Sequence, residues 1–68
     1  MLVLFSRSSD AQLRTARLLF EFGVAPESAE FGSDLVRFFD EDLGGLVYAD
    51  NPGGLTRSAY RRFVDSQS

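Results

Sequence analysis

The chain has 68 residues and contains no cysteine, no histidine and no lysine. A domain of this length is near the lower limit for folding without disulfides or a bound metal, and cysteine and histidine are the side chains that usually supply either. Its stability must therefore come from an apolar core or from a partner subunit. Hydrophobic residues make up 44% of the chain and include seven phenylalanines, which is typical of a folded protein. We expect a single domain over residues 1–68.

The same absences argue against most enzymes. Thiolate and imidazole are the usual nucleophiles, general bases and transition-metal ligands, and lysine supplies Schiff-base chemistry. The densest acidic cluster, Asp40-Glu41-Asp42, lacks the alternating ligands and the fixed glycine of a calcium loop. Gly53-Gly54-Leu55-Thr56 matches neither the P-loop nor the dinucleotide pattern. We therefore expect a non-enzymatic protein with no catalytic residue, no metal site and no cofactor.

The first five residues are apolar but too few for the core of a signal peptide, and no basic residue precedes them. No stretch approaches the roughly 20 apolar residues of a membrane span. The lack of cysteine fits a reducing compartment. These features predict a cytoplasmic protein that does not bind membranes.

Hydrophobic patterning predicts a small two-layer α/β or α+β sandwich, with a short sheet and three helices in the order β-α-(β)-α-β-α. We expect a buried strand at residues 2–5 and a helix from about residue 9 to residue 22, ended by Gly23. Residues 28–31 suit either a short edge strand or a loop. A second helix is predicted at 34–43, a strand at 46–49 and a turn at 50–54. A last helix follows from an N-cap at Thr56 to about Asp65.

The predicted helix at 34–43 has a clear amphipathic pattern. Its apolar side chains fall on one face and its charged ones on the other. The apolar set is Leu35, Val36, Phe38, Phe39 and Leu43, and the charged set is Asp34, Arg37, Asp40 and Glu41.

The predicted first helix differs, because it has apolar side chains on two nearly opposite faces. Such a helix is either enclosed within the fold or exposes one apolar face to another subunit. In so small a chain we favour the second arrangement, a homodimer. The expected self-association residues are Leu18, Phe22 and Phe31.

Charge is segregated along the chain. Residues 21–50 carry eight acids and one arginine, whereas both ends are basic. The acids either form a solvated face that pairs with the basic ends or bind a basic protein partner. The candidate partner-binding acids are Glu27, Glu30, Asp34, Asp40, Glu41 and Asp42. Alternatively, the basic last helix contacts nucleic-acid phosphates through Arg57, Arg61 and Arg62.

Leu4-Phe5-Ser6-Arg7, followed by a helix that ends in Leu18-Leu19-Phe20-Glu21-Phe22-Gly23-Val24, resembles the opening of glutaredoxins and other small thioredoxin-like proteins. Where that family has C-x-x-C, this chain has Ser9-Asp10-Ala11-Gln12, and the family's Thr-Val-Pro segment has no counterpart. The resemblance implies a thioredoxin-like adaptor without thiol–disulfide exchange, because no sulfur nucleophile is present.

Together these observations predict a non-enzymatic protein-interaction module with an acidic surface for a basic, nucleic-acid-binding partner. Small acidic single-domain proteins of this kind include inhibitors from phages and mobile elements, such as anti-CRISPR proteins and polymerase inhibitors. The alternatives are a small nucleic-acid-binding or regulatory domain that uses the arginine-rich last helix, and the redox-inactive thioredoxin-like adaptor.

Overall fold

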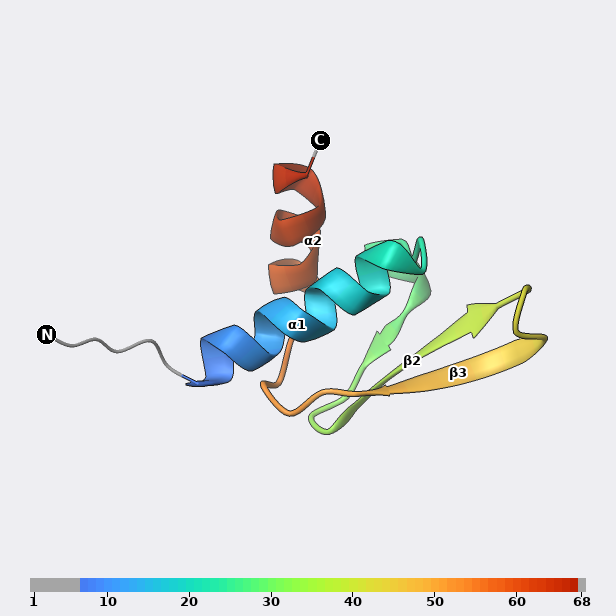
Figure 1. The fold of residues 1–68 in the computed structure, drawn as a ribbon, viewed down its shortest axis with the longest axis horizontal. Coiled ribbons are helices and arrows are strands. Elements are labelled where there is room, and N and C mark those ends of the chain that lie inside the picture. The colour runs from blue at the N-terminus through green and yellow to red at the C-terminus, as the bar shows by residue number, and fades with distance from the viewer. Residues whose placement is uncertain (1–6, 68) are drawn as a thin grey trace, which may run out of the picture.

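The computed structural model describes residues 7–67. Their order is α-β-β-β-α, and the fold is α+β (Figure 1). Two α-helices, rather than the three helices that we expected, accompany a three-stranded antiparallel sheet in the order β1-β2-β3. The strand predicted at residues 2–5 lies outside the described residues. The elements are α1 (Arg7–Glu21), the one-turn 3₁₀ helix η1 (Pro26–Ser28), β1 (Glu30–Phe31), β2 (Leu35–Asp40), β3 (Gly45–Asp50) and α2 (Arg57–Ser66).

The end of α1 is set by Gly23, as predicted. Gly23 has a φ of 75°, a left-handed conformation that a residue without Cβ adopts at little cost. Its N–H donates to the carbonyl of Phe20 at 2.9 Å, and the N–H of Val24 donates to that of Leu19 at 3.0 Å. This pair of bonds is a Schellman motif, which satisfies the last carbonyls of α1 and turns the chain towards η1.

The helix predicted at residues 34–43 is wrong, because most of this segment is strand β2. Its burial alternates along the strand: Val36 and Phe38 are buried, whereas Leu35, Arg37 and Phe39 are exposed. Alternation of this kind follows from the two-residue period of a strand. The chain then turns at residues 41–44, where Gly44 has a φ of 83°, and returns as β3.

The remaining predicted elements fare better. The strand predicted at 46–49 is confirmed as β3, and the final helix is confirmed as α2. The hydroxyl of Thr56 accepts the N–H of Ala59 at 3.2 Å, so the predicted N-cap is confirmed as well. Of the two options for residues 28–31, Glu30 and Phe31 form a strand that pairs antiparallel to β2.

The core lies between α1, one face of the sheet and the first turns of α2. Its buried members are Ala16, Leu19, Ala29, Val36, Phe38, Ala49, Leu55 and Tyr60. The hydroxyl of Tyr60 donates to the carbonyl of Val24 at 2.6 Å, and burial raises the pKa of this phenol above its ordinary value. Tyr60 thus connects α2 to the chain that leaves α1.

A buried asparagine joins the turn that follows β3 to two other segments. The side chain of Asn51 is fully buried and accepts the N–H of Leu55 at 2.7 Å. Its amide group donates to the carbonyls of Leu55 and Gly32 at 3.0 and 2.8 Å. Asn51 therefore links the end of the β2–β3 hairpin, the β1–β2 turn and the segment that leads into α2.

Candidate functional site

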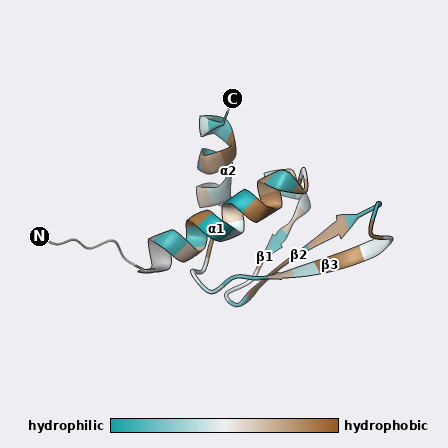
Figure 2. Cartoon of the chain, viewed as in Figure 1, coloured by the Kyte–Doolittle hydropathy of each residue, from teal (hydrophilic) through white to brown (hydrophobic). Residues whose placement is uncertain are grey.

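The sheet has one covered face and one uncovered face in the described part of the chain. We call the uncovered one the outer face and define it by Leu35, Arg37, Phe39, Leu46 and Tyr48. Phe39 pairs with Leu46 and Arg37 pairs with Tyr48, so these side chains are cross-strand neighbours. The apolar members are highly exposed, at 63% for Phe39, 59% for Leu46 and 56% for Tyr48. Figure 2 shows the hydrophobic stretches of β2 and β3 that contribute to this face.

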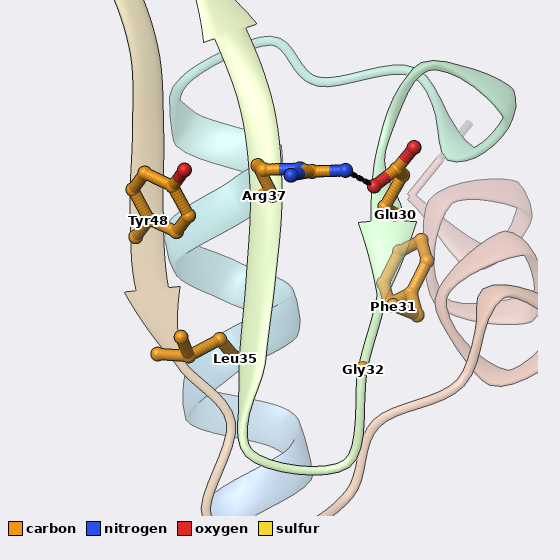
Figure 3. A pocket seen from close by; sticks show the side chains of 6 residues that line it. All are labelled: Glu30, Phe31, Gly32, Leu35, Arg37 and Tyr48. Carbon is orange, nitrogen blue, oxygen red and sulfur yellow. Dashed lines mark hydrogen bonds and ion pairs between the residues drawn. The ribbon is translucent and has the colours of Figure 1, made fainter.

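An ion pair crosses the outer face between two strands. Arg37 reaches from β2 to the carboxylate of Glu30 on β1, while Tyr48 lies on its other side on β3 (Figure 3). A shallow hollow of about 360 Å³ lies on one side of this pair, lined by Leu35 and Tyr48 among others. A second hollow of about 330 Å³ lies on the other side, beside Phe39 and Leu46. The guanidinium has more donors than one carboxylate uses, and its side chain remains 44% exposed.

The six candidate partner-binding acids lie in separate parts of the structure. Asp40, Glu41 and Asp42 stay together at the tip of the β2–β3 hairpin, where a carboxylate oxygen of Asp40 accepts the N–H of Asp42 at 3.1 Å. Glu30 is held by Arg37 on the outer face, and Glu27 in η1 lies 3.4 Å from Arg61. Asp34 is in the β1–β2 turn, at the opposite end of the hairpin strands. Only the tip acids form a contiguous acidic group, which we call the acidic tip.

The three candidate self-association residues also separate. Leu18 and Phe22 on α1 are 42% and 43% exposed. The ring of Phe22 packs against that of buried Phe38, with 5.6 Å between centroids. Phe31, by contrast, is partly buried against the core, 5.8 Å from the ring of Tyr60. Phe31 is therefore part of the packing between β1 and α2, and Leu18 and Phe22 remain as an exposed pair.

Two of the three arginines of α2 make contacts within the fold. Arg57 donates to the carbonyls of Pro26 and Ala29 at 3.1 and 2.9 Å, and its guanidinium lies 5.9 Å from the centre of the Phe31 ring. Arg57 thus holds η1 against α2. Arg61 pairs with Glu27.

Residues 7–67 show no group of three or more acids that could hold a metal ion. In the same range, no helix is both long enough and apolar enough to cross a membrane. The phenol of Tyr60, whose pKa burial raises, lies in the core and donates a hydrogen bond to a backbone carbonyl, so its role is structural.

Sequence reasoning missed the outer face because it assigned residues 34–43 to a helix. One signal was available. Gly44-Gly45 directly precedes the strand predicted at 46–49, and a glycine pair next to a strand is typical of a hairpin turn. Pairing this strand with residues 35–40 brings Phe39, Leu46 and Tyr48 together on one face.

Comparison of the chain with protein-family models, with curated proteins and with solved structures found no match. The outer face and the acidic tip are therefore interpreted from their geometry and chemistry.

Proposed function

We propose that this protein is a non-enzymatic protein-interaction module that binds its partner through the outer face of the sheet. The observation that carries the proposal is the cluster of Phe39, Leu46 and Tyr48, each more than half exposed on adjacent strands. Aromatic side chains grouped in this way are typical anchors of protein interfaces. Burial of one such ring against a partner contributes about 2 kcal/mol.

The charges around this cluster indicate the chemistry of the partner. The acidic tip lies at one end of the outer face, and the exposed Asp50, which pairs with Leu35, lies at the other. Glu30 flanks the face on β1, where Arg37 partly neutralises it. A partner with an apolar centre and basic flanks complements this arrangement, and the acids would accelerate its approach.

A basic nucleic-acid-binding groove on another protein has this chemistry. A module that occupies such a groove acts as an inhibitor, because it competes with nucleic acid for the same surface. In this proposal the apolar cluster supplies most of the affinity, while the acidic tip selects basic partners. The engagement of Arg57 and Arg61 within the fold favours this proposal over direct nucleic-acid binding by α2.

The test is quantitative affinity capture from cells of the source organism, followed by titration of the partner that is found. The outer-face variant is Phe39→Ser with Tyr48→Ser. The matched control is Leu13→Ser, which replaces an apolar side chain of 45% exposure on α1. Each variant is first checked for native circular dichroism.

We expect the wild type and the control to retain the partner and the outer-face variant to lose at least tenfold in affinity. Neutralising the acidic tip with Asp40→Asn, Glu41→Gln and Asp42→Asn should slow association and reduce its dependence on salt. Equal binding by the folded outer-face variant contradicts the proposal. So does a shift of DNA or RNA by the protein alone at low salt, if that shift is lost on Arg62→Gln.

A further inference from the structure

The outer edge of β3 directs backbone groups away from the sheet. The N–H of Asn51 donates to the carbonyl of Asp34 at 2.8 Å, which fixes the alternation of the β2–β3 ladder. In an antiparallel ladder every second residue directs its N–H and C=O to the neighbouring strand. Val47 therefore bonds to β2, whereas Leu46 and Tyr48 direct their backbone groups away from it. In the sheet that the described residues form, β3 is an edge strand.

This edge has little of the usual protection against strand addition. β3 contains no lysine and no proline, and its pairing with β2 has no bulge. Its only charged residue, Asp50, is at one end. An edge of this kind readily pairs with a strand of another molecule.

An apolar flank of α1 lies beside the same edge. The opposite flank packs on α2, where Phe20 meets Phe63 with 5.8 Å between the rings. Because α2 is bound to η1 beside β1, that opposite flank is on the β1 side of the sheet. Leu18 and Phe22 lie about 160° around the helix from Phe20, since each residue turns it by about 100°. They are therefore on the β3 side, and both are exposed.

The helix itself lies over β2 and β3. The ring of Phe22 packs on that of Phe38 in β2, and the hydroxyl of Thr15 lies 3.5 Å from the carbonyl oxygen of Asp50 in β3. Figure 3 shows α1 behind these two strands and antiparallel to β3. Neighbouring strands are about 4.8 Å apart, so the helix axis lies within about 5 Å of β3.

We infer that the β3 edge is a dimer interface, at which β3 of a second copy of this chain pairs antiparallel to it across a two-fold axis. The two three-stranded sheets then join into one. Both α1 helices lie on the same face of the joined sheet, because the axis is perpendicular to it. Two-fold dimers that use one surface twice are the commonest protein oligomers.

The sequence of β3 is self-complementary about Val47. Antiparallel pairing centred there places Leu46 of each copy opposite Tyr48 of the other, and both residues direct their backbone groups outward. Each of the two Leu46–Tyr48 pairs exchanges both backbone hydrogen bonds and forms an apolar cross-strand contact. A centre at Tyr48 would instead place Leu46 opposite the carboxylate of Asp50. The register centred on Val47 is therefore favoured.

The same register brings the two α1 helices together. Val47, at the axis, pairs with Phe38, on which Phe22 packs, so Phe22 also lies close to the axis. Two helices that each lie over β2 and β3 come to roughly 10 Å apart, which is the usual distance between packed helices. Leu18 and Phe22 of the two copies then cover one another. Of the predicted self-association residues these two lie in the interface, whereas Phe31 does not.

The charges at the two ends of the interface are complementary through α1. Antiparallel pairing sets the acidic tip of one copy beside the Asp50 end of the other, and these acids repel. Arg14 is exposed one helical turn before Leu18 on the same flank, and it is next to Thr15 at the Asp50 end. Its guanidinium is thus on the side from which the acidic tip of the second copy approaches, and it offsets the repulsion.

This dimer leaves the outer faces of both copies on the same side of the joined sheet and open to a partner. Its interface consists of the β3 backbone and of α1 on the other face. The inference is therefore independent of the partner proposed for the outer face.

The first test is sedimentation equilibrium over a range of protein concentrations. We expect the mass to rise from 7.6 kDa towards twice that value. The disrupting variant is Leu18→Glu, and the matched control is Leu13→Glu. These leucines are on opposite flanks of α1 and have similar exposure, 42% and 45%. With native circular dichroism, Leu18→Glu should weaken dimerisation by about tenfold or more, and Leu13→Glu should leave it unchanged.

Amide hydrogen exchange by NMR on the wild type locates the interface without a variant. The amides of Leu46 and Tyr48 should become protected as the concentration rises, because they bond to β3 of the second copy. The amides of Val47 and Ala49 bond to β2 at every concentration and serve as internal controls. In a mixture of labelled and unlabelled protein, NOEs between Leu46 of one copy and Tyr48 of the other should establish the register.

A monomeric mass at millimolar concentration overturns the inference. So does a dimer that Leu13→Glu weakens as strongly as Leu18→Glu, or one in which the amides of Leu46 and Tyr48 exchange rapidly. Protection of these two amides that does not change with concentration also overturns it. These measurements need no other protein, so their outcome is separate from the test of the proposed function.

Discussion

Replacement of Asn51 by alanine should be among the most damaging single changes in this chain. The change removes three hydrogen bonds of one fully buried side chain. Two of the groups that lose their hydrogen-bond partner are the N–H and C=O of Leu55. Leu55 is only 3% exposed, so water cannot easily take the place of the Asn51 side chain. The third is the carbonyl of Gly32, an exposed residue that water can reach.

The magnitude follows from these partners. Each buried group left without a bond costs about 1–3 kcal/mol, and we expect a total loss of about 3 kcal/mol. A domain of 68 residues has roughly 3–10 kcal/mol of stability, so this is a large fraction of the whole. Asn51→Asp should be no better, because its carboxylate keeps the bond from Leu55 N–H but faces two carbonyl oxygens without a donor.

The assay is urea unfolding followed by far-ultraviolet circular dichroism. With a slope of about 1 kcal/mol per molar urea, the midpoint of Asn51→Ala should fall by about 3 M. The control is Gln12→Ala, which removes one partly buried hydrogen bond to Gly53 and should cost about 1 kcal/mol. If Asn51→Ala destabilises no more than Gln12→Ala, the reasoning about the buried hydrogen bonds is refuted.

Three further changes test other contacts. Burial raises the pKa of Tyr60. The stability that its neutral phenol contributes is therefore complete below about pH 10 and is lost as pH rises through the folded-state pKa. Absorbance at 295 nm in a Tyr48→Phe background should show that Tyr60 ionises at higher pH than a free tyrosine. Tyr60→Phe should cost about 1 kcal/mol at neutral pH and abolish this alkaline loss, and an unchanged alkaline profile would contradict the assignment. A lysine at position 57 cannot reproduce the two hydrogen bonds from Arg57 to backbone carbonyls in and beside η1. In thermal unfolding, Arg57→Lys should lower the free energy of unfolding by about 1–2 kcal/mol. An unchanged free energy of unfolding would mean that those bonds do not contribute to stability. Thr56→Ala removes the N-cap of α2 and should cost about 1 kcal/mol in the same assay, whereas a loss below 0.3 kcal/mol, roughly the size of a surface effect, would argue against the cap.

The elements that sequence reasoning predicted correctly have strong local signals. Gly23 stops α1 because a left-handed residue is needed there, and Thr56 starts α2 because a hydroxyl is needed to accept a backbone N–H. Such signals act over a few residues and depend little on the rest of the fold. They gave the extent of α2 and the end of α1.

The segment 34–43 was misassigned because its two faces are both partly apolar. Val36 and Phe38 face the core, while Leu35 and Phe39 lie on the outer face. Polar residues in place of Leu35 and Phe39 would have given an alternation of apolar and polar side chains, which indicates a strand. The side chains that make the outer face a candidate site are thus the same ones that obscured its secondary structure.

The role of Asn51 was also beyond reach of the sequence. Asparagine followed by proline and glycine predicts a turn, and a turn is present. Its bonds to Gly32 and Leu55 depend on the β1–β2 turn lying beside the segment before α2, which only the assembled fold provides.

The β2–β3 hairpin extends well beyond the end of α1 (Figure 1), in a molecule whose longest dimension is 46 Å. The residue pairs nearest the hairpin tip, Asp40 with Gly45 and Phe39 with Leu46, are its outer rungs, and the side chains of Phe39 and Leu46 are exposed. The other end of the hairpin is held by the hydrogen bonds of Asn51. The hairpin should therefore unzip from the tip inward, with an opening free energy that rises rung by rung towards Asn51. In the complex proposed above, a partner bound at the acidic tip would be able to bend these outer rungs while the core stays intact. The proposed interface would then adjust to partners of slightly different shape.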